Sequence, residues 1–134
     1  MDLENHDIVI EKLEGVLNES PKIDSDNAPI AARLADLYAE RARIKSLKEG
    51  DENCKNCHKS NQDRLKSLSL YEKSFPHIET ASQGHVLMQM AHLQQMLGRG
   101  KKATALFNKI IAQRKKYAPV ILGQSYVGLG EIYY

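Results

Sequence analysis

The sequence predicts an all-α protein of about six helices, packed as antiparallel hairpins in an elongated solenoid stack. Apolar residues recur at spacings of three and four along most of the 134-residue chain, and this is the period of an amphipathic helix. Turn-forming stretches such as Ser20-Pro21 and Gly98-Arg99-Gly100 separate these segments. No segment alternates apolar and polar residues as a strand does, so a helical class is expected throughout.

Residues 1–20 are expected to form one amphipathic helix that caps the N-terminal end of the stack. Val9, Leu13, Val16 and Leu17 follow the helical period, and Ser20-Pro21 marks the end of the segment.

Residues 28–76 are expected to form the first hairpin. Asp26 or Asn27 can cap a helix from about Pro29 to Leu47, with the proline in its first turn. Residues 48–62 are polar and rich in turn formers, which predicts an exposed insertion loop. The partner helix follows this loop and stops at Pro76. Its predicted apolar positions are Leu65, Leu68, Tyr71 and Phe75.

Residues 83–116 are expected to form the second hairpin, with helices over about 83–97 and 101–116. Gly98 lies between them, where a residue free to adopt positive φ is needed. The last helix, over residues 119–134, begins with Pro119 in its first turn. It is either the first helix of a third, truncated repeat or a second cap.

Three stretches share one spacing of large and small residues. The copies are Ala31, Leu34, Ala35 and Tyr38; then Leu87, Met90, Ala91 and Gln94, followed by Ala103 and Phe107; and finally Tyr126, Leu129, Gly130 and Tyr133. This spacing resembles that of the tetratricopeptide repeat (TPR) family over roughly residues 28–134. The third copy matches the family's Trp/Tyr-x2-Leu-Gly-x2-Tyr pattern best.

Close helix packing requires small residues where two backbones cross and large residues around them. The small contacts are expected at Ala35, Ala91, Ala103 and Gly130. The large core positions are expected at Leu34, Tyr38, Tyr71, Leu87, Met90, Phe107, Ile110, Tyr126, Leu129 and Tyr133.

The resemblance implies a non-enzymatic scaffold that binds a peptide or another protein in a concave groove lined by the first helix of each repeat. The predicted groove residues are Arg33, Asp36, Glu40, Met88, Gln89, His92 and Gln95. Ala32 and Asp36 stand where the family's carboxylate clamp needs Lys and Asn, so a C-terminal carboxylate is not the expected ligand.

The segment Cys54-Lys55-Asn56-Cys57-His58 carries the one motif with its own chemistry. C-x-x-C-H is the attachment signature of c-type haem, and the same three side chains could hold zinc if His77, His85, His92 or a partner chain supplied a fourth ligand. The flanking residues are polar, unlike a haem pocket. A dithiol or disulfide between Cys54 and Cys57 is the leading interpretation, no cofactor is expected, and a metal- or haem-carrying module is the alternative function.

The charge balance of 19 Lys and Arg against 17 Asp and Glu gives no whole-chain field that favours nucleic acid. Apolar runs such as Val120-Ile121-Leu122 are too short to insert in a membrane. The acidic N-terminus is unlike a signal peptide, so we expect a cytoplasmic location as written, or a periplasmic one if a signal was removed. The C-terminal helix leaves an apolar face through which copies could self-associate.

Overall fold

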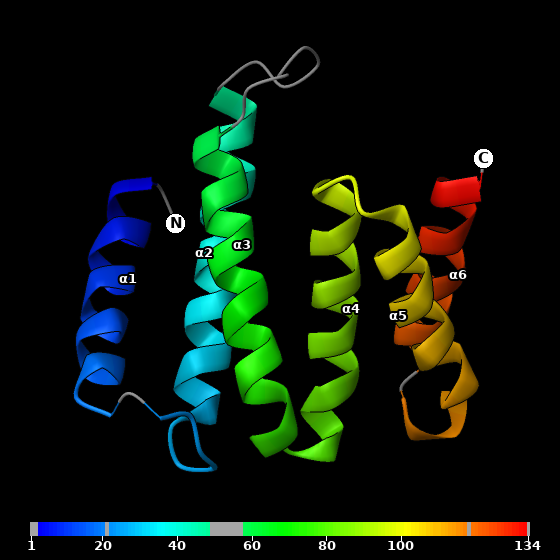
Figure 1. Ribbon diagram of the computed structural model, residues 1–134, viewed down its shortest axis with the longest axis horizontal. Helices are drawn as coiled ribbons and strands as arrows, with labels where there is room; N and C mark the ends of the chain where they lie inside the picture. Colours follow the sequence, from blue (N-terminus) through cyan, green and yellow to red (C-terminus); the bar gives the residue numbers. More distant parts are fainter. Residues whose placement is uncertain (1–2, 21, 49–57, 118, 134) are drawn as a thin grey trace. The chain divides into compact units, whose positions relative to one another are not determined.

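The computed structural model describes residues 3–20, 22–48, 58–117 and 119–133, and within them the regular structure is helical. The chain divides into two units, Met1–His77 and Ile78–Tyr134 (Figure 1). The first unit contains α1 (Leu3–Asn18), α2 (Ala28–Lys48), α3 (His58–Ser74) and the short 3-10 turn η2 (Phe75–His77). The second contains α4 (Thr80–Met96), α5 (Gly100–Ala112), the 3-10 turn η3 (Arg114–Lys116) and α6 (Pro119–Tyr133).

A cluster of hydrogen bonds around Asp24 and Asn27 fixes the start of α2. The Asn27 side chain accepts a hydrogen bond from the Asp24 backbone N–H at 2.8 Å and donates one to the Lys22 carbonyl, also at 2.8 Å. The Asp24 carboxylate in return accepts from the backbone N–H groups of Asp26 and Asn27. The helix begins at the next residue, Ala28, so the predicted start and the place of Pro29 in the first turn are confirmed.

Helices α2 and α3 form an antiparallel hairpin whose contacts run in opposite directions along the chain. Tyr71, late in α3, donates a hydrogen bond to Asp36, in the first half of α2. Asp63, early in α3, accepts a hydrogen bond from Arg41, which lies later in α2. Ala35 is fully buried, and the Ser67 hydroxyl donates to its carbonyl at 2.7 Å. The helices therefore approach closely at this small residue, as predicted.

The predicted insertion loop over 48–62 is wrong at both ends. Lys48 belongs to α2, and α3 begins at His58 rather than after Gln62. The first turns of α3 bury polar residues, with Ser60 at 0% exposure and Asp63 at 2%. A search for apolar periodicity does not detect such a helix, because its buried face is polar. Leu65, expected on the buried face, is 44% exposed.

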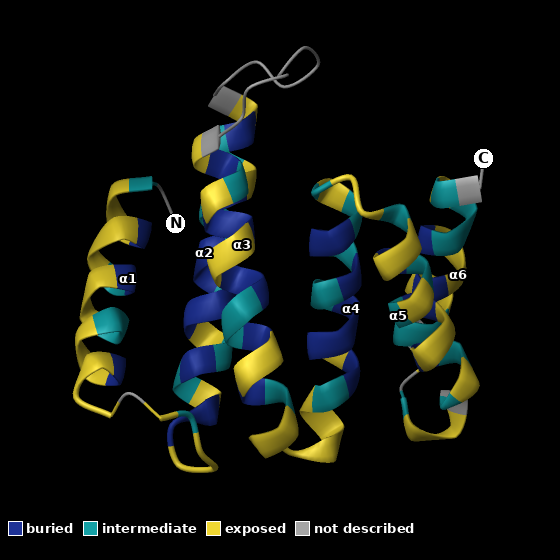
Figure 2. Ribbon diagram, viewed as in Figure 1, coloured by how far each residue is buried: buried dark blue, intermediate teal, exposed yellow. Residues whose placement is uncertain are grey.

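In the second unit, α5 packs antiparallel to α4, and α6 contacts both helices. Gly98 adopts φ of 76° between α4 and α5, as expected for a turn that needs a left-handed residue. Helix α4 begins at Thr80, three residues before the predicted start, and α5 ends at Ala112 before η3. Figure 2 shows buried residues on the facing sides of these helices.

Most of the predicted large core residues are buried, but the C-terminal ones are not. Leu34, Tyr38, Tyr71, Leu87, Phe107 and Ile110 are at most 4% exposed. Met90 and Leu129 are half-buried, and Tyr126 is 58% exposed, so its assignment to the core is wrong. The side chain of Tyr133 lies outside the described residues.

The small contact in α6 is Gly128, two residues before the predicted Gly130. A Cβ built on Gly130 would meet nothing within 4 Å, whereas one built on Gly128 would stand 2.7 Å from Phe107 Cε1. Ala91 and Ala103 are fully buried, as residues at close helix contacts are expected to be. The best sequence match to the repeat pattern thus has the wrong helical register.

Candidate functional site

The seven predicted groove residues fall into two sets, one in each unit. Arg33, Asp36 and Glu40 lie on α2, whereas Met88, Gln89, His92 and Gln95 lie on α4.

On α2, Asp36 and Glu40 have partners inside the first unit. The Tyr71 hydroxyl donates to the Asp36 carboxylate, and His6 Nε2 lies 3.1 Å from Glu40 Oε2. The His6 contact lowers the pKa of the Glu40 carboxyl. Arg33 is exposed. Two of these three residues therefore contribute to packing of the first unit.

On α4, Met88 is only 3% exposed, so its predicted outward orientation is wrong. Gln89 is half-buried. His92 and Gln95 are half-buried too, and both contact the surface that α4 shares with α6. This surface is the strongest candidate site in the second unit.

A hollow of about 500 Å³ lies between α4 and α6, and we call it the α4–α6 groove. His92 supplies its α4 side, and the α6 side is formed by Gly123, Gln124, Val127, Gly128 and Glu131. At one end, Gln95 Nε2 donates a hydrogen bond to Glu131 Oε2 at 3.0 Å. Val127 is 62% exposed, so the groove presents an apolar side chain to solvent.

His92 connects the groove to the core of the second unit. Its ring meets Phe107 edge to face, with ring centroids 5.8 Å apart and an interplanar angle of 60°. Burial lowers the pKa of His92, although the nearby Glu131 carboxylate acts in the opposite direction. The imidazole is therefore neutral at physiological pH and offers one donor and one acceptor.

The sequence prediction missed the α6 residues Gln124, Val127 and Glu131. The predicted groove included only the first helices of the first two repeats, and residues 119–134 were expected to contribute core contacts and a surface for self-association. In the same pattern these residues form the first helix of a third repeat, which is the signal that points to this face.

The first unit contains a second hollow, of about 450 Å³, between α1, α2 and α3. Its floor includes Leu17, Leu34 and Leu70, and Glu14 and Lys66 provide charge. Tyr38 also lines it, and its hydroxyl donates to the Glu14 carboxylate. Burial, with the bond to Glu14, raises the pKa of Tyr38, so the phenol stays protonated.

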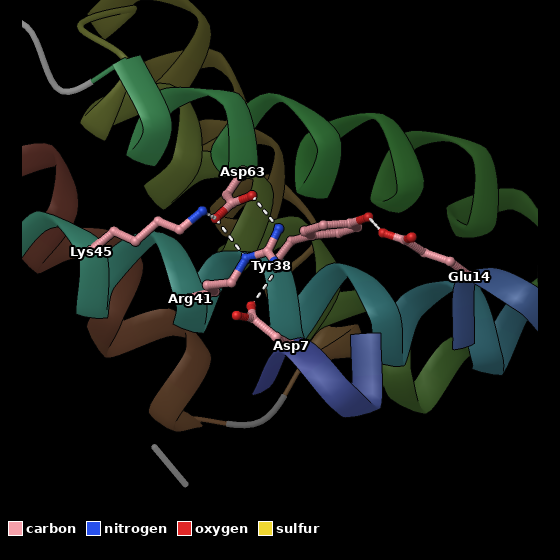
Figure 3. Close-up of polar contacts among 6 residues, drawn as sticks. All are labelled: Asp7, Glu14, Tyr38, Arg41, Lys45 and Asp63. Atoms are coloured by element: carbon pink, nitrogen blue, oxygen red, sulfur yellow. Dashed lines mark hydrogen bonds and ion pairs between the residues drawn. The ribbon is translucent and has the colours of Figure 1, made fainter. Parts of the chain in front are cut away.

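A network of charged side chains joins the three helices of the first unit (Figure 3). Arg41 makes two hydrogen bonds to the Asp63 carboxylate, at 2.9 and 2.8 Å, and a third to Asp7 at 2.8 Å. Lys45 Nζ lies 3.0 Å from Asp63 Oδ2, the oxygen that also accepts the hydrogen bond from Arg41 Nε. Burial alone would raise the pKa of Asp63, but the bonds from Arg41 and Lys45 outweigh burial and hold the pKa below its ordinary value.

This network has the properties of a structural site. The Asp63 side chain is 3% exposed, and both of its carboxylate oxygens are already paired with cations. A carboxylate whose pKa is lowered in this way is a weak base at neutral pH, which does not favour a role in proton transfer. We therefore assign the network to helix packing.

The possible disulfide between Cys54 and Cys57 lies outside the described residues, as does the side chain of His58. Among the described residues, no three His, Cys, Asp or Glu side chains are grouped as a metal site would require. His77 belongs to the first unit, and His85 and His92 lie on α4 of the second. The zinc and haem alternatives remain predictions from the sequence.

None of the described helices combines the length and the apolar character needed to cross a membrane. Comparison of the chain with protein-family models, with curated proteins and with solved structures returned no match.

Proposed function

We propose that this protein is a non-enzymatic interaction module, similar to TPR proteins, that binds a peptide segment of another protein in the α4–α6 groove. The observation that carries the proposal is the position of α6 against the α4–α5 hairpin. It leaves the exposed Val127 beside the half-buried His92, with Gln124 and Glu131 along the same edge.

The direction of the helices supports the repeat-like part of the proposal. Gly84, near the start of α4, lies against Tyr117, just before α6, and Gln95, near the end of α4, bonds Glu131 near the end of α6. The two helices therefore run parallel, with α5 antiparallel to both. A hairpin followed by the first helix of the next hairpin has this arrangement in a helical repeat.

The chemistry of the groove favours binding over catalysis. Its polar groups are a neutral imidazole, side-chain amides and one exposed carboxylate, all suited to hydrogen bonds with a peptide backbone or side chain. Val127 offers a contact for an apolar side chain of the partner. Binding energy would come from a preformed surface, so little of it is lost in ordering the protein.

Site-specific photo-crosslinking tests this proposal. A benzophenone amino acid replaces Val127 in one variant and Leu65 in the other, because Leu65 is an exposed apolar residue on α3 of the first unit. We expect the Val127 variant to crosslink a discrete partner in native lysate and the Leu65 variant to give none. Val127→Glu should abolish recovery of that partner, whereas Leu65→Glu should retain it.

Equal crosslinking at both positions, or recovery unaffected by Val127→Glu, would contradict the groove assignment. Far-UV circular dichroism of each variant serves as the folding control. Both positions are solvent-exposed, so neither substitution should unfold the chain.

A further inference from the structure

The hollow of the first unit has charges of both signs in its wall, and we call it the α1–α3 pocket. Its volume is about 450 Å³, within the range of about 300–1,000 Å³ that is usual for small-molecule sites. Helices α1 and α3 both pack on α2, and each of the three helices contributes to the lining. The whole lining therefore belongs to one unit.

The floor of the α1–α3 pocket is apolar. Leu17 and Leu34 are buried members of the core cluster, and Leu70 packs against that cluster. These residues come from α1, α2 and α3 in turn, so an apolar group placed here would contact all three helices. Removing apolar surface from water is favourable in proportion to its area, so the floor is suited to a ligand with an apolar body.

Glu14 places a carboxylate on the α1 side of the pocket. The Tyr38 hydroxyl donates a hydrogen bond to Glu14 Oε1, and the Tyr38 ring extends from α2 toward α1 to make this contact (Figure 3). Among the described residues, no other side chain donates to this half-buried carboxylate or forms an ion pair with it. The carboxylate is therefore held in position while Oε2 can still accept from a cation.

Lys66 places an ammonium on the α3 side of the pocket. Its Nζ lies 5.5 Å from the centroid of the Tyr38 ring, which is a cation–π distance. Arg41 also lies over this ring, at 5.3 Å, but its guanidinium is paired with Asp63 and Asp7. In the part of the chain that the structure describes, no carboxylate pairs with the Lys66 ammonium.

Glu14 and Lys66 thus meet at one tyrosine without forming an ion pair with each other. One contacts the hydroxyl of Tyr38 and the other its ring, so both charges are within reach of a single small ligand. An apolar ligand would cover both charges without giving either a partner, which is unfavourable. A ligand with one charge would leave the other charge in that state. A ligand that carries an ammonium, a carboxylate and an apolar group matches both walls and the floor.

We propose that the α1–α3 pocket binds a small zwitterion with an apolar side chain, of the class of a free aliphatic amino acid. The ligand's ammonium binds the Glu14 carboxylate, its carboxylate binds the Lys66 ammonium, and its side chain covers the apolar floor. Ser69 and Asn18 also line the pocket and can make further hydrogen bonds. A dipeptide carries the same groups farther apart and is the second source of this chemistry.

This site does not rest on the proposed peptide binding. Its residues belong to α1, α2 and α3, whereas the α4–α6 groove is lined from α4 and α6. A ligand in the pocket contacts α1 and α3 at once, so it should stabilise the docking of α1 on the α2–α3 hairpin. Charge pairs that water can reach contribute little, so the expected Kd is on the order of 1 mM.

An NMR titration of the full chain labelled with nitrogen-15 tests the assignment. The four probes are L-leucine, isoamylamine, which lacks the carboxylate, 4-methylpentanoate, which lacks the ammonium, and the dipeptide leucyl-leucine. We expect leucine to shift the amide signals of Leu17, Leu34 and Leu70 saturably and to leave those of His92 and Gln124 unchanged. The two singly charged analogues should bind about three- to tenfold more weakly. Saturation by the dipeptide at a lower concentration than leucine would identify a peptide as the source.

Two variants separate the roles of the two charges. Glu14→Gln keeps an oxygen that accepts from Tyr38, and Lys66 is exposed, so neither Glu14→Gln nor Lys66→Gln should unfold the chain. Glu14→Gln should weaken leucine binding about three- to tenfold without changing the binding of 4-methylpentanoate. Lys66→Gln should weaken leucine equally without changing the binding of isoamylamine. Glu11→Gln and Lys73→Gln, at exposed positions of the same helices, should bind leucine as the wild type does.

Three results would overturn the proposal. The first is the absence of saturable shifts at the pocket with leucine at about 50 mM, far above the expected Kd. The second is an analogue that binds as tightly as leucine, because one charge would then be sufficient. The third is leucine binding that neither Glu14→Gln nor Lys66→Gln weakens. Photo-crosslinking at Val127 reports on the other unit, so either proposal can fail while the other stands.

Discussion

Gly128 sets the distance between α6 and α5, because its missing side chain makes room for the Phe107 ring. Phe107 is fully buried, and a Cβ at position 128 would stand 2.7 and 2.8 Å from two of its ring atoms. A buried ring surrounded by close-packed neighbours has little room to move. This contact, rather than the Leu129-Gly130 pair, defines the inner face of α6.

Gly128→Ala is therefore expected to lower the free energy of unfolding by about 1–3 kcal/mol through overpacking. Gly130→Ala is the matched control, since it adds the same methyl group in open space on the same helix. It should raise stability by up to about 1 kcal/mol, because Ala favours helix over Gly. Urea unfolding measures the stability of both variants. If Gly130→Ala were the more destabilising of the two, Gly130 rather than Gly128 would be the close contact, as the repeat pattern predicts.

Asp63 gives the protein a stability term that depends on pH. Its pKa is lowered in the folded state, so its contribution is complete above the unfolded pKa of about 4 and is lost as the pH falls through the lower folded value. Asp63→Asn removes the charge, leaves Lys45 partly buried without its anion and leaves Arg41 with Asp7 as its remaining anion. The expected loss at pH 7 is about 3–5 kcal/mol.

The pH series provides the discriminating measurement. Urea unfolding of the wild type between pH 7 and pH 2 should show falling stability on the acid side, and Asp63→Asn should show a smaller fall. Parallel curves for the two proteins would mean that other carboxylates account for the acid sensitivity.

At the scale of single elements, α1 is held on α2 by one buried stripe. Ile10 is 2% exposed and belongs to a core cluster with Leu17, Leu34 and Tyr38, whereas Ile8, on the same helix, is 47% exposed. Ile10→Ala should cost about 2–5 kcal/mol, and Ile8→Ala less than about 1 kcal/mol. Amide hydrogen exchange should show lost protection throughout α1 in the first variant only.

The connection between α2 and α3 carries the cysteine motif. If the dithiol interpretation is right, protein made in an exporting host should contain no stoichiometric zinc and show no Soret band. Cys54→Ser with Cys57→Ser should cost no more than about 2 kcal/mol, since the closed loop is very short. A bound metal or haem would instead support the carrier function, and elemental analysis with a visible spectrum separates the two.

Helix positions were largely predictable from the sequence, but the network of charged side chains between α2 and α3 was not. Apolar spacing and turn formers locate most helices to within a few residues, and Ala35, Ala91 and Ala103 were recognised as close contacts. The pairing of Arg41 with Asp63 joins residues 22 apart in sequence. It depends on how two helices align, which local periodicity does not determine.

The candidate site was only partly predictable from the sequence, because local periodicity does not fix which face of a helix is covered by its neighbours. His92 and Gln95 follow from the position of α4 as the first helix of a hairpin. The predicted outward orientation of Met88 was wrong, because a one-residue change of position rotates a side chain by about 100° around a helix. Its neighbours Leu87 and Ala91 are buried too, so the buried face of α4 is broader than the sequence pattern suggested.

For the whole molecule, the division at His77–Ile78 predicts that the first unit folds alone. Its charged network and its α1–α2–α3 core lie entirely within Met1–His77. A fragment of residues 1–77 should therefore retain helical circular dichroism and unfold cooperatively in urea. The complementary fragment 78–134 is shorter, and domains of about 60 residues are marginal, so it should be the less stable of the two.

An unfolded 1–77 fragment would mean that the first unit needs the second for stability. Adding the 78–134 fragment back would then distinguish association from simple instability, since recovery of helicity requires contact between the two.

The ion pairs at Asp63 also affect how the stability of the α2–α3 hairpin changes with temperature. The cost of removing charges from water falls on warming, because hydration of ions carries a strongly negative entropy. The stabilisation that ion pairs contribute is therefore better retained on warming than their modest contribution at room temperature would suggest. We therefore expect the ion pairs that align α2 with α3 to keep much of their contribution to stability as the temperature rises.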